Sequence, residues 1–136
     1  MRNSRRACPS STAAATLPRV RTPLRIPGST LSIADGRVFV VAEIGKNFIQ
    51  TEEPRPAGEY LANALRLVDE AVAAGADAVK FQTHELDDEQ LDIPVTSPHF
   101  TGSDRYRWVK RNAEATPLEF WRAVQAHCAA RGVVFL

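Results

Sequence analysis

The chain has 136 residues, of which 44% are hydrophobic and 24% charged, and this composition is typical of a soluble globular protein of one domain. No apolar run approaches the roughly 20 residues that a membrane-spanning helix needs. Its two cysteines, Cys8 and Cys128, are too few for a disulfide framework and match no zinc-ligand spacing. We therefore expect a cytoplasmic protein that does not act at a membrane.

The formal net charge of +1 is distributed unevenly. Residues 1–34 contain six arginines and no acidic residue, whereas the other 102 residues contain 11 basic and 16 acidic ones. A mildly acidic folded part argues against nucleic acid as a partner.

The first 30 residues are rich in Ser, Thr, Pro, Ala and Arg. An Arg-rich, Ser-rich and acid-poor start is also typical of organellar transit peptides. Four prolines oppose the amphipathic helix of such a peptide, namely Pro9, Pro18, Pro23 and Pro27. We prefer the interpretation that residues 1–30 are a disordered basic arm.

Ordered structure is predicted to begin near Leu31. The segments 31–33 and 38–41 flank Asp35-Gly36, a dipeptide typical of tight turns, and they predict a short β-hairpin. The second of these strands is apolar throughout, so we expect both of its faces to be covered.

Two helices are predicted from the spacing of apolar residues. The first covers residues 57–74 and ends at Gly75, with the stripe Leu61, Leu65, Val68 and Val72. The second begins at a capping box over residues 116–119, ends at Gly132, and carries the stripe Leu118, Trp121, Val124 and Cys128.

An apolar strand is predicted after each helix, over residues 78–82 and 133–136. Residues 83–115 are acidic and polar and predict a long loop, with at most short helical turns. The order β-α-β-α-β with apolar strands predicts a parallel sheet. Because three strands leave unpaired edges, we expect the chain to be the N-terminal portion of a larger barrel or doubly wound domain.

Polar residues follow the first two strands of this predicted sheet, and we expect them to converge on one pocket. They are Glu43, Lys46 and Asn47 after the first strand and Lys80, Gln82 and Thr83 at the end of the second. Lys80 and Gln82 point to the same side of an otherwise apolar strand. A lysine there is costly to desolvate without a negative partner, so Lys80 suggests a site for a phosphate or a carboxylate. The alternative is a buried ion pair between Lys80 and Glu43 without any substrate, although such pairs seldom add net stability.

Other chemistry-bearing residues carry weaker signals. The three histidines, His84, His99 and His127, fit no metal-ligand pattern. The acidic run at 85–92 lacks the glycine and spacing of a calcium loop. Aromatic and basic residues alternate over 105–108, but four residues make no extended platform for bases.

Two motifs carry a family resemblance. Val-Ala-Glu-Ile-Gly-Lys-Asn at 41–47 and Ala-Gly-Ala-Asp-Ala-Val-Lys-Phe-Gln-Thr at 74–83 resemble the start of the sialic acid synthases, the N-acetylneuraminate synthase-like enzymes. This family includes legionaminate, pseudaminate and spore-coat polysaccharide relatives. The resemblance covers about residues 31–136.

The resemblance implies the N-terminal part, about three β/α units, of a TIM (β/α)8 barrel. Such an enzyme condenses phosphoenolpyruvate with an N-acylated amino sugar, of the N-acetylmannosamine type, to a nonulosonic acid and phosphate. A divalent metal, manganese or magnesium, assists in the family, and its ligands come from later strands that this chain lacks. The family also forms homodimers. We therefore expect this chain to be inactive alone.

The resemblance also implies roles for residues of this chain. Lys80 matches the lysine that holds phosphoenolpyruvate, Gln82 matches a residue contacting the sugar, and Glu43 matches an active-site carboxylate. The neighbouring Asn47 and Thr83 are further candidates for binding substrate.

The chain departs from the family pattern after the first motif. The family commonly reads Gly-Val-Asn-His-Asn-Gly, whereas this chain reads Gly-Lys-Asn-Phe-Ile-Gln at 45–50, so that Phe48 replaces a histidine. The following segment is lengthened by residues 51–56. Two alternatives therefore remain: another phosphoenolpyruvate-dependent aldol-type synthase, and a non-enzymatic binding module that uses the basic arm.

Overall fold

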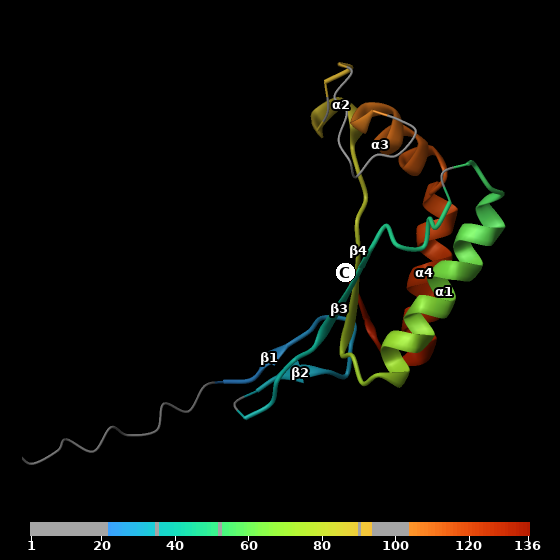
Figure 1. Ribbon diagram of the computed structural model, residues 1–136. Helices are drawn as coiled ribbons and strands as arrows, with labels where there is room; N and C mark the ends of the chain where they lie inside the picture. Colours follow the sequence, from blue (N-terminus) through green and yellow to red (C-terminus); the bar gives the residue numbers. More distant parts are fainter. Residues whose placement is uncertain (1–21, 35, 52, 90, 94–103) are drawn as a thin grey trace, which may run out of the picture.

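The computed structural model describes residues 22–34, 36–51, 53–89, 91–93 and 104–136. Figure 1 shows a sheet with two long helices on one side and a small antiparallel pair of strands at its lower end. In chain order the elements are β1 (Leu24–Arg25), β2 (Ser32–Ile33), β3 (Val41–Gly45), α1 (Ala57–Ala73), β4 (Ala78–Phe81), α2 (Leu86–Glu89), α3 (Arg105–Glu114), α4 (Leu118–Arg131) and β5 (Val134–Phe135).

The predicted parallel sheet is confirmed. Its strand order is β3-β4-β5, and both pairings are parallel, with α1 connecting β3 to β4 and α4 preceding β5. The register places Glu43 opposite Lys80, and it shifts between Glu43 and Gly45. This arrangement is compatible with part of a barrel, because such barrels are built from parallel strands joined by helices.

Helices α1 and α4 form a single layer on one face of the sheet (Figure 1). Their buried faces join alternate strand residues in one core cluster, which includes Val68, Val79, Phe120 and Val124. Leu118 belongs to the predicted stripe of α4 but is 58% exposed, so that part of the prediction was wrong. Phe120 takes its place in the core.

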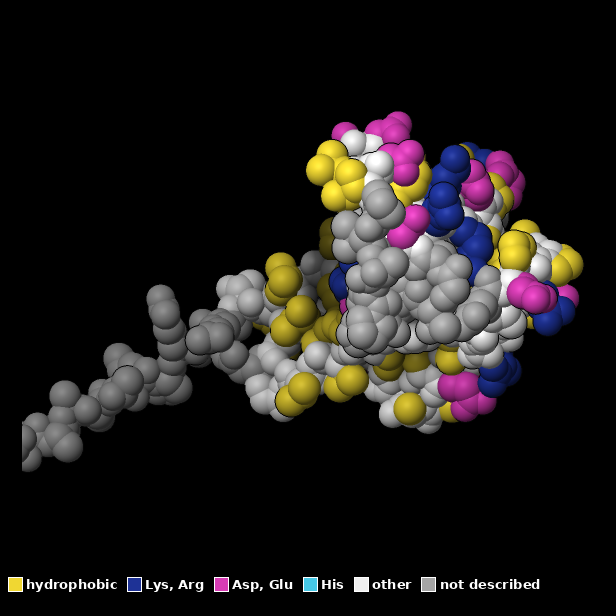
Figure 2. Space-filling view, turned by 45° about the horizontal axis from the view of Figure 1, so that its top comes forward, with side chains coloured by type: hydrophobic (Ala, Val, Ile, Leu, Met, Phe, Trp, Pro, Cys, Tyr) yellow, Lys and Arg dark blue, Asp and Glu magenta, His cyan; other side chains and the backbone are white. Residues whose placement is uncertain are grey.

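The opposite face of the sheet is open. Val40 and Val41, which we expected to be covered on both faces, are 48% and 43% exposed. The expectation was wrong because the long helices in the described ranges cover the other face of the sheet alone (Figure 1). Exposed apolar side chains also gather near the β1–β2 pair in Figure 2.

Glycines end both long helices, as the sequence predicts. Gly75 and Gly132 have φ angles of 86° and 70°, a backbone conformation that costs glycine little. The predicted capping box is not formed at the start of α4, because Pro117 occupies the cap position and provides no side-chain hydrogen bond. The Thr116 hydroxyl instead donates to the Asn112 carbonyl oxygen at 3.0 Å and satisfies the end of α3.

The predicted hairpin has a different partner. Strand β2 pairs antiparallel with β1, with Leu24 opposite Ile33, and not with residues 38–41. The turn between them contains Pro27-Gly28, where Gly28 has a φ of 73°. Residues 22–30 are therefore part of the fold and not of the arm, while residues 1–21 and Asp35 lie outside the described residues.

Residues 38–41 run alongside β4 instead. The Val40 carbonyl oxygen accepts from the amides of Asp77 and Ala78 at 2.9 and 3.1 Å. The Asp77 side chain in turn accepts from the Val40 amide at 2.9 Å and forms an ion pair with Arg37. These contacts across about 40 residues determine where the segment pairs.

The predicted long loop at 83–115 contains two helices. Helix α2 is a single turn, whereas α3 has 10 residues, and Asp104 caps it by accepting from the Arg107 amide at 2.8 Å. The buried face of α3 consists of Val109 and Asn112. Residues 94–103 of the same segment lie outside the described residues. None of the helices in the described ranges has the length and apolar character needed to cross a bilayer.

Candidate functional site

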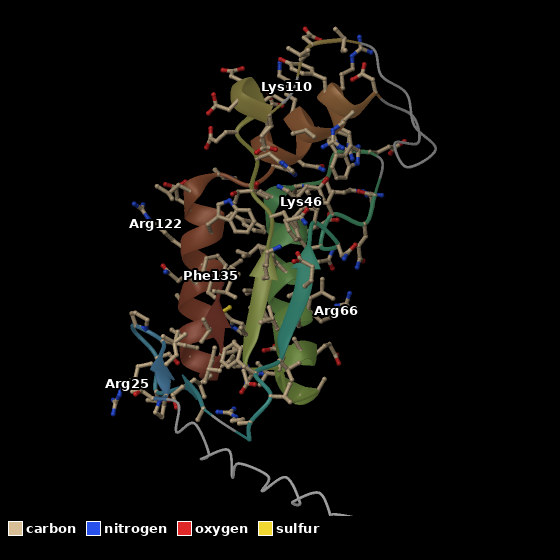
Figure 3. The ribbon with its side chains drawn as sticks, turned by 90° about the vertical axis from the view of Figure 1, so that its left-hand side faces the viewer. Arg25, Lys46, Arg66, Lys110, Arg122 and Phe135 are labelled. Carbon is tan, nitrogen blue, oxygen red and sulfur yellow. The ribbon has the colours of Figure 1, made fainter. Side chains whose placement is uncertain are left out.

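The candidate site lies on the open face of the sheet, toward the carboxyl ends of β3 and β4. Figure 3 views the sheet from this side, with α1 and α4 behind it. Ile44, Val79 and Phe81 pack toward the helices in the core cluster. Because side chains alternate along a strand, Glu43 and Lys80 project to the open side.

Glu43 and Lys80 form an ion pair between neighbouring strands. The Lys80 amine donates to the Glu43 carboxylate, and the two residues are partners in the strand register. Their side chains are 46% and 48% exposed, so this is not a buried ion pair. The expectation of a lysine enclosed in an apolar strand was wrong, because one face of that strand meets solvent.

Gln82 lies beside this pair, across Gly45. A Cβ atom built at Gly45 would lie 3.4 Å from Glu43 Oε1 and 3.6 Å from Gln82 Cδ. The φ of Gly45 is +57°, so a side chain there would be strained as well as crowded. The glycine therefore allows Glu43, Lys80 and Gln82 to share a small area of the open face.

Asn47 and Thr83 flank the three residues at the same end of the sheet. Asn47 lies in the turn after β3, where its backbone amide donates to the Ile44 carbonyl oxygen at 3.0 Å. Thr83 directly follows Gln82, and both Asn47 and Thr83 are exposed. Asn47 and Thr83 therefore lie at the rim of the candidate site, whereas Gln82 and the ion pair of Glu43 with Lys80 lie at its centre.

Phe48, which stands where the family that the first motif resembles has a histidine, does not reach the open face. It is fully buried, and its ring centroid lies 5.2 Å from that of Phe120 and 6.1 Å from that of Trp121. Asn63 on α1 donates to the Phe48 carbonyl oxygen at 3.3 Å. The substitution therefore contributes to the core and not to the candidate site.

Lys46 follows β3 and was predicted to converge on the same pocket, but the structure buries it. The residue is 8% exposed, and among the described residues its amine has no hydrogen-bond partner. Burial lowers the pKa of Lys46 to about 8, partly opposed by the nearby negative charge of Glu89. The signal in the sequence was the lysine itself, placed between Gly45 and Asn47 where the family has valine.

The histidines have separate partners. His84 Nδ1 lies 2.6 Å from a carboxylate oxygen of Glu89, and this hydrogen bond is the main cause of the lowered pKa of Glu89. His127 Nε2 lies 2.8 Å from Asp69 and connects α4 to α1. His99 lies outside the described residues. Within the described ranges, no three His, Cys, Asp or Glu residues gather closely enough to hold a metal ion.

The geometry corresponds to a class of site. Polar side chains at the carboxyl ends of adjacent parallel strands are the usual position of small-molecule sites in α/β proteins. No protein-family model matches the chain, and no curated protein matches it.

A solved structure does match. The chain is similar to the spore coat polysaccharide biosynthesis protein SpsE from Bacillus subtilis, with 28% sequence identity and a TM-score of 0.51. The match covers 85% of this chain and 27% of SpsE. It supports an α/β fold of that type and agrees in part with the resemblance seen in the sequence, over about a quarter of the length of SpsE.

Proposed function

We propose that this chain provides the phosphoenolpyruvate-binding part of a synthase that acts in carbohydrate biosynthesis. The reaction would join phosphoenolpyruvate and water to an N-acylated amino sugar of the N-acetylmannosamine type and release a nonulosonic acid and phosphate. The observation that carries the proposal is the exposed pair of Lys80 and Glu43, with Gln82 beside it, at the carboxyl edge of a parallel sheet. The likeness to a polysaccharide biosynthesis protein supports the same class of pathway.

Lys80 would bind an anionic group of phosphoenolpyruvate. In the free protein the Glu43 carboxylate holds the Lys80 ammonium group on the open face of the sheet. An exposed ion pair contributes only about 0–1 kcal/mol, so a ligand phosphate can displace or share this carboxylate at small cost. Hydrogen bonds between charged groups then make the new contact stronger than a neutral one.

Glu43 and Gln82 would serve the second substrate. A carboxylate released from Lys80 can accept a proton from the water that attacks C2 of phosphoenolpyruvate, after the enol carbon has joined the sugar aldehyde. The Gln82 amide has both donors and an acceptor, which suit sugar hydroxyl groups. Asn47 and Thr83 would add contacts at the rim. The divalent metal expected from the family would polarise the aldehyde, with ligands outside the described residues.

A binding experiment with the 136-residue chain tests the proposal. We expect Lys80→Met to weaken phosphoenolpyruvate binding about tenfold or more in titration calorimetry, because a charge-assisted hydrogen bond is lost. Lys110→Met is the matched control, since Lys110 is exposed on α3 and separate from the ion pair. Equal affinities of the two variants would contradict the proposal.

Measuring the affinity for the sugar distinguishes a direct contact of Lys80 with the anion from a structural role of Lys80. Lys80→Met should change the affinity for N-acetylmannosamine much less than that for phosphoenolpyruvate, because the proposed contact is to the anion. An equal loss for both ligands would show that Lys80 supports the fold.

A turnover assay tests whether the chain acts alone. With phosphoenolpyruvate, N-acetylmannosamine and manganese, we expect no phosphate release from the 136-residue chain, which spans 27% of SpsE. Phosphate release above that of Lys80→Met would refute this. Preference for an unacylated aldose would favour another phosphoenolpyruvate-dependent aldol-type synthase.

A further inference from the structure

Lys46 is a buried cation whose amine has no hydrogen-bond partner in the described part of the chain. The amine lies beneath the surface at the end of β3. Figure 3 shows Lys46 at the upper end of the strands, below α3. Buried polar groups in folded proteins are nearly always paired, so a buried amine without a partner calls for a ligand or another physical explanation.

The neighbours of Lys46 compensate its charge only in part. The amine lies 5.8 Å from the centroid of the Trp121 ring on α4, a cation–π distance. Glu89 on α2 is the nearby negative charge, but its carboxylate is already bound by His84 at 2.6 Å and by the Glu85 amide at 3.0 Å. The ammonium group therefore keeps hydrogen-bond donors that no acceptor among the described residues occupies.

This position is separate from the candidate site on the open face. Lys80 projects to the side of the sheet that the helices leave uncovered, whereas Lys46 contacts Trp121, which packs against the helix-side core. Glu43 pairs with Lys80. The two lysines therefore lie near the same end of the strands but on different sides of the sheet.

We propose that Lys46 is the cation of a second, buried oxyanion site, formed where the turn after β3 meets the corner between α3 and α4. The site takes a small phosphate or carboxylate group. It is independent of the binding of phosphoenolpyruvate at Lys80.

Thermal unfolding of the 136-residue chain with inorganic phosphate tests the site. At equal ionic strength set by chloride, we expect phosphate to raise the Tm of the wild-type chain, because a ligand that binds the folded state stabilises it. Lys46→Met keeps the length of the side chain but removes the charge, and it should remove most of this rise. Lys80→Met, whose effect on phosphoenolpyruvate is tested separately, should retain it.

Further measurements identify the anion, and a second variant is provided in case the first does not fold. A rise of Tm with acetate as well as phosphate assigns a carboxylate-binding site, and a rise with phosphate alone assigns a phosphate site. If Lys46→Met does not fold, Lys46→Gln provides the uncharged variant. The proposal is overturned if phosphate has no effect on the wild-type chain, if the uncharged variant responds as the wild type does, or if Lys80→Met alone removes the response.

Discussion

Phe48 is the largest side chain that the described part of the fold buries completely. Its ring lies 5.9 Å from that of Phe81 on the sheet and 5.2 Å from that of Phe120 on α4, measured between centroids. It therefore joins the segment after β3 to both layers. Phe48 is thus a residue of the core and not of the candidate site.

Removing this ring should destabilise the chain strongly. We expect Phe48→Ala to lower the free energy of unfolding by about 3–5 kcal/mol, because a fully buried aromatic side chain leaves a cavity. Urea unfolding followed by circular dichroism measures this. Leu118→Ala, at a 58% exposed position, is the control and should change stability by about 0.5 kcal/mol or less. A similar small loss for Phe48→Ala would contradict its place in the core.

Cys128 should be chemically inert in the folded chain. It is fully buried on α4, and burial raises the pKa of its thiol from 9.0 to about 11. Because the thiolate is the reactive form, we expect iodoacetamide at about pH 8 to modify Cys128 about 100-fold more slowly than in urea. Peptide mapping by mass spectrometry distinguishes Cys128 from Cys8. Equal rates in both conditions would show that the thiol is accessible.

Helices α1 and α4 are linked by polar contacts as well as by the hydrophobic core. Asp69 on α1 accepts from Arg131 at 2.6 Å and lies 2.8 Å from His127, both on α4. The hydrogen bond from Arg131, followed by that from His127, lowers the pKa of the Asp69 carboxyl below 3.8. These contacts favour the ionised carboxylate in the folded state.

The contribution of Asp69 should depend on pH in a defined direction. Its pKa is lower in the folded state, so the stabilisation is present above the pKa of the unfolded chain and is lost as the pH falls through the folded value. We expect Asp69→Asn to be less stable than the wild type at about pH 6, with the difference closing as the pH falls below 3.8.

Chemical unfolding across this pH range measures the difference. Asp88→Asn on α2 is the matched control, because Asp88 is exposed and lies away from the contact between α1 and α4. A gap between Asp69→Asn and the wild type that stays constant from about pH 6 to about pH 3 would contradict the assignment.

Charged side chains at the end of the molecule are arranged by element. Acidic side chains gather over α2 and basic ones over α3 (Figure 2), and α3 carries Arg105, Arg107 and Lys110. Arg105 contributes to the lowered pKa of Glu89 on α2. The two short helices therefore interact across opposite charges, next to the end of the sheet where the candidate site lies.

For the whole molecule, the sheet determines how stability is distributed. Strand β4 is hydrogen-bonded on both sides, since the Ala78 amide donates to Val40 and the Phe81 amide donates to Leu136. The β1–β2 pair is short, with two residues in each strand, and Leu24 is 64% exposed. The central strand should therefore open only with the whole fold.

Hydrogen exchange followed by NMR measures this distribution. We expect the Ala78 and Phe81 amides to exchange about 100-fold or more slowly than the amides of Arg25 and Ile33. Comparable exchange in β4 and in the β1–β2 pair would show that the three-stranded sheet does not form the stable centre of the chain.

Much of the helical and strand layout could be predicted from short segments. Gly75 and Gly132 end their helices where predicted, and the apolar run at 78–82 forms β4. Helix α3 was missed because its buried face has few apolar residues, with Asn112 in a position where a pattern requires an apolar side chain. The hairpin was assigned to the wrong partner because a turn dipeptide does not specify which strands pair.

The candidate site could be located in part. Lys80 and Gln82 are two residues apart in one strand, which places their side chains on the same side of the sheet. The parallel pairing of the two strands places Glu43 beside them. The burial of Lys46 could not be predicted, because it depends on Trp121, which is 75 residues away in the chain. The exposure of the ion pair likewise depends on which face the helices cover.

By itself, the sequence determined the parallel β/α order and the polar residues at the strand ends, because apolar spacing, glycine stops and side-chain alternation act over a few residues. Tertiary structure alone decided the pairing of β2 with β1, the open face that exposes Lys80, and the enclosure of Phe48 and Lys46. These features arise from contacts between distant segments, whose packing depends on the whole set of neighbours.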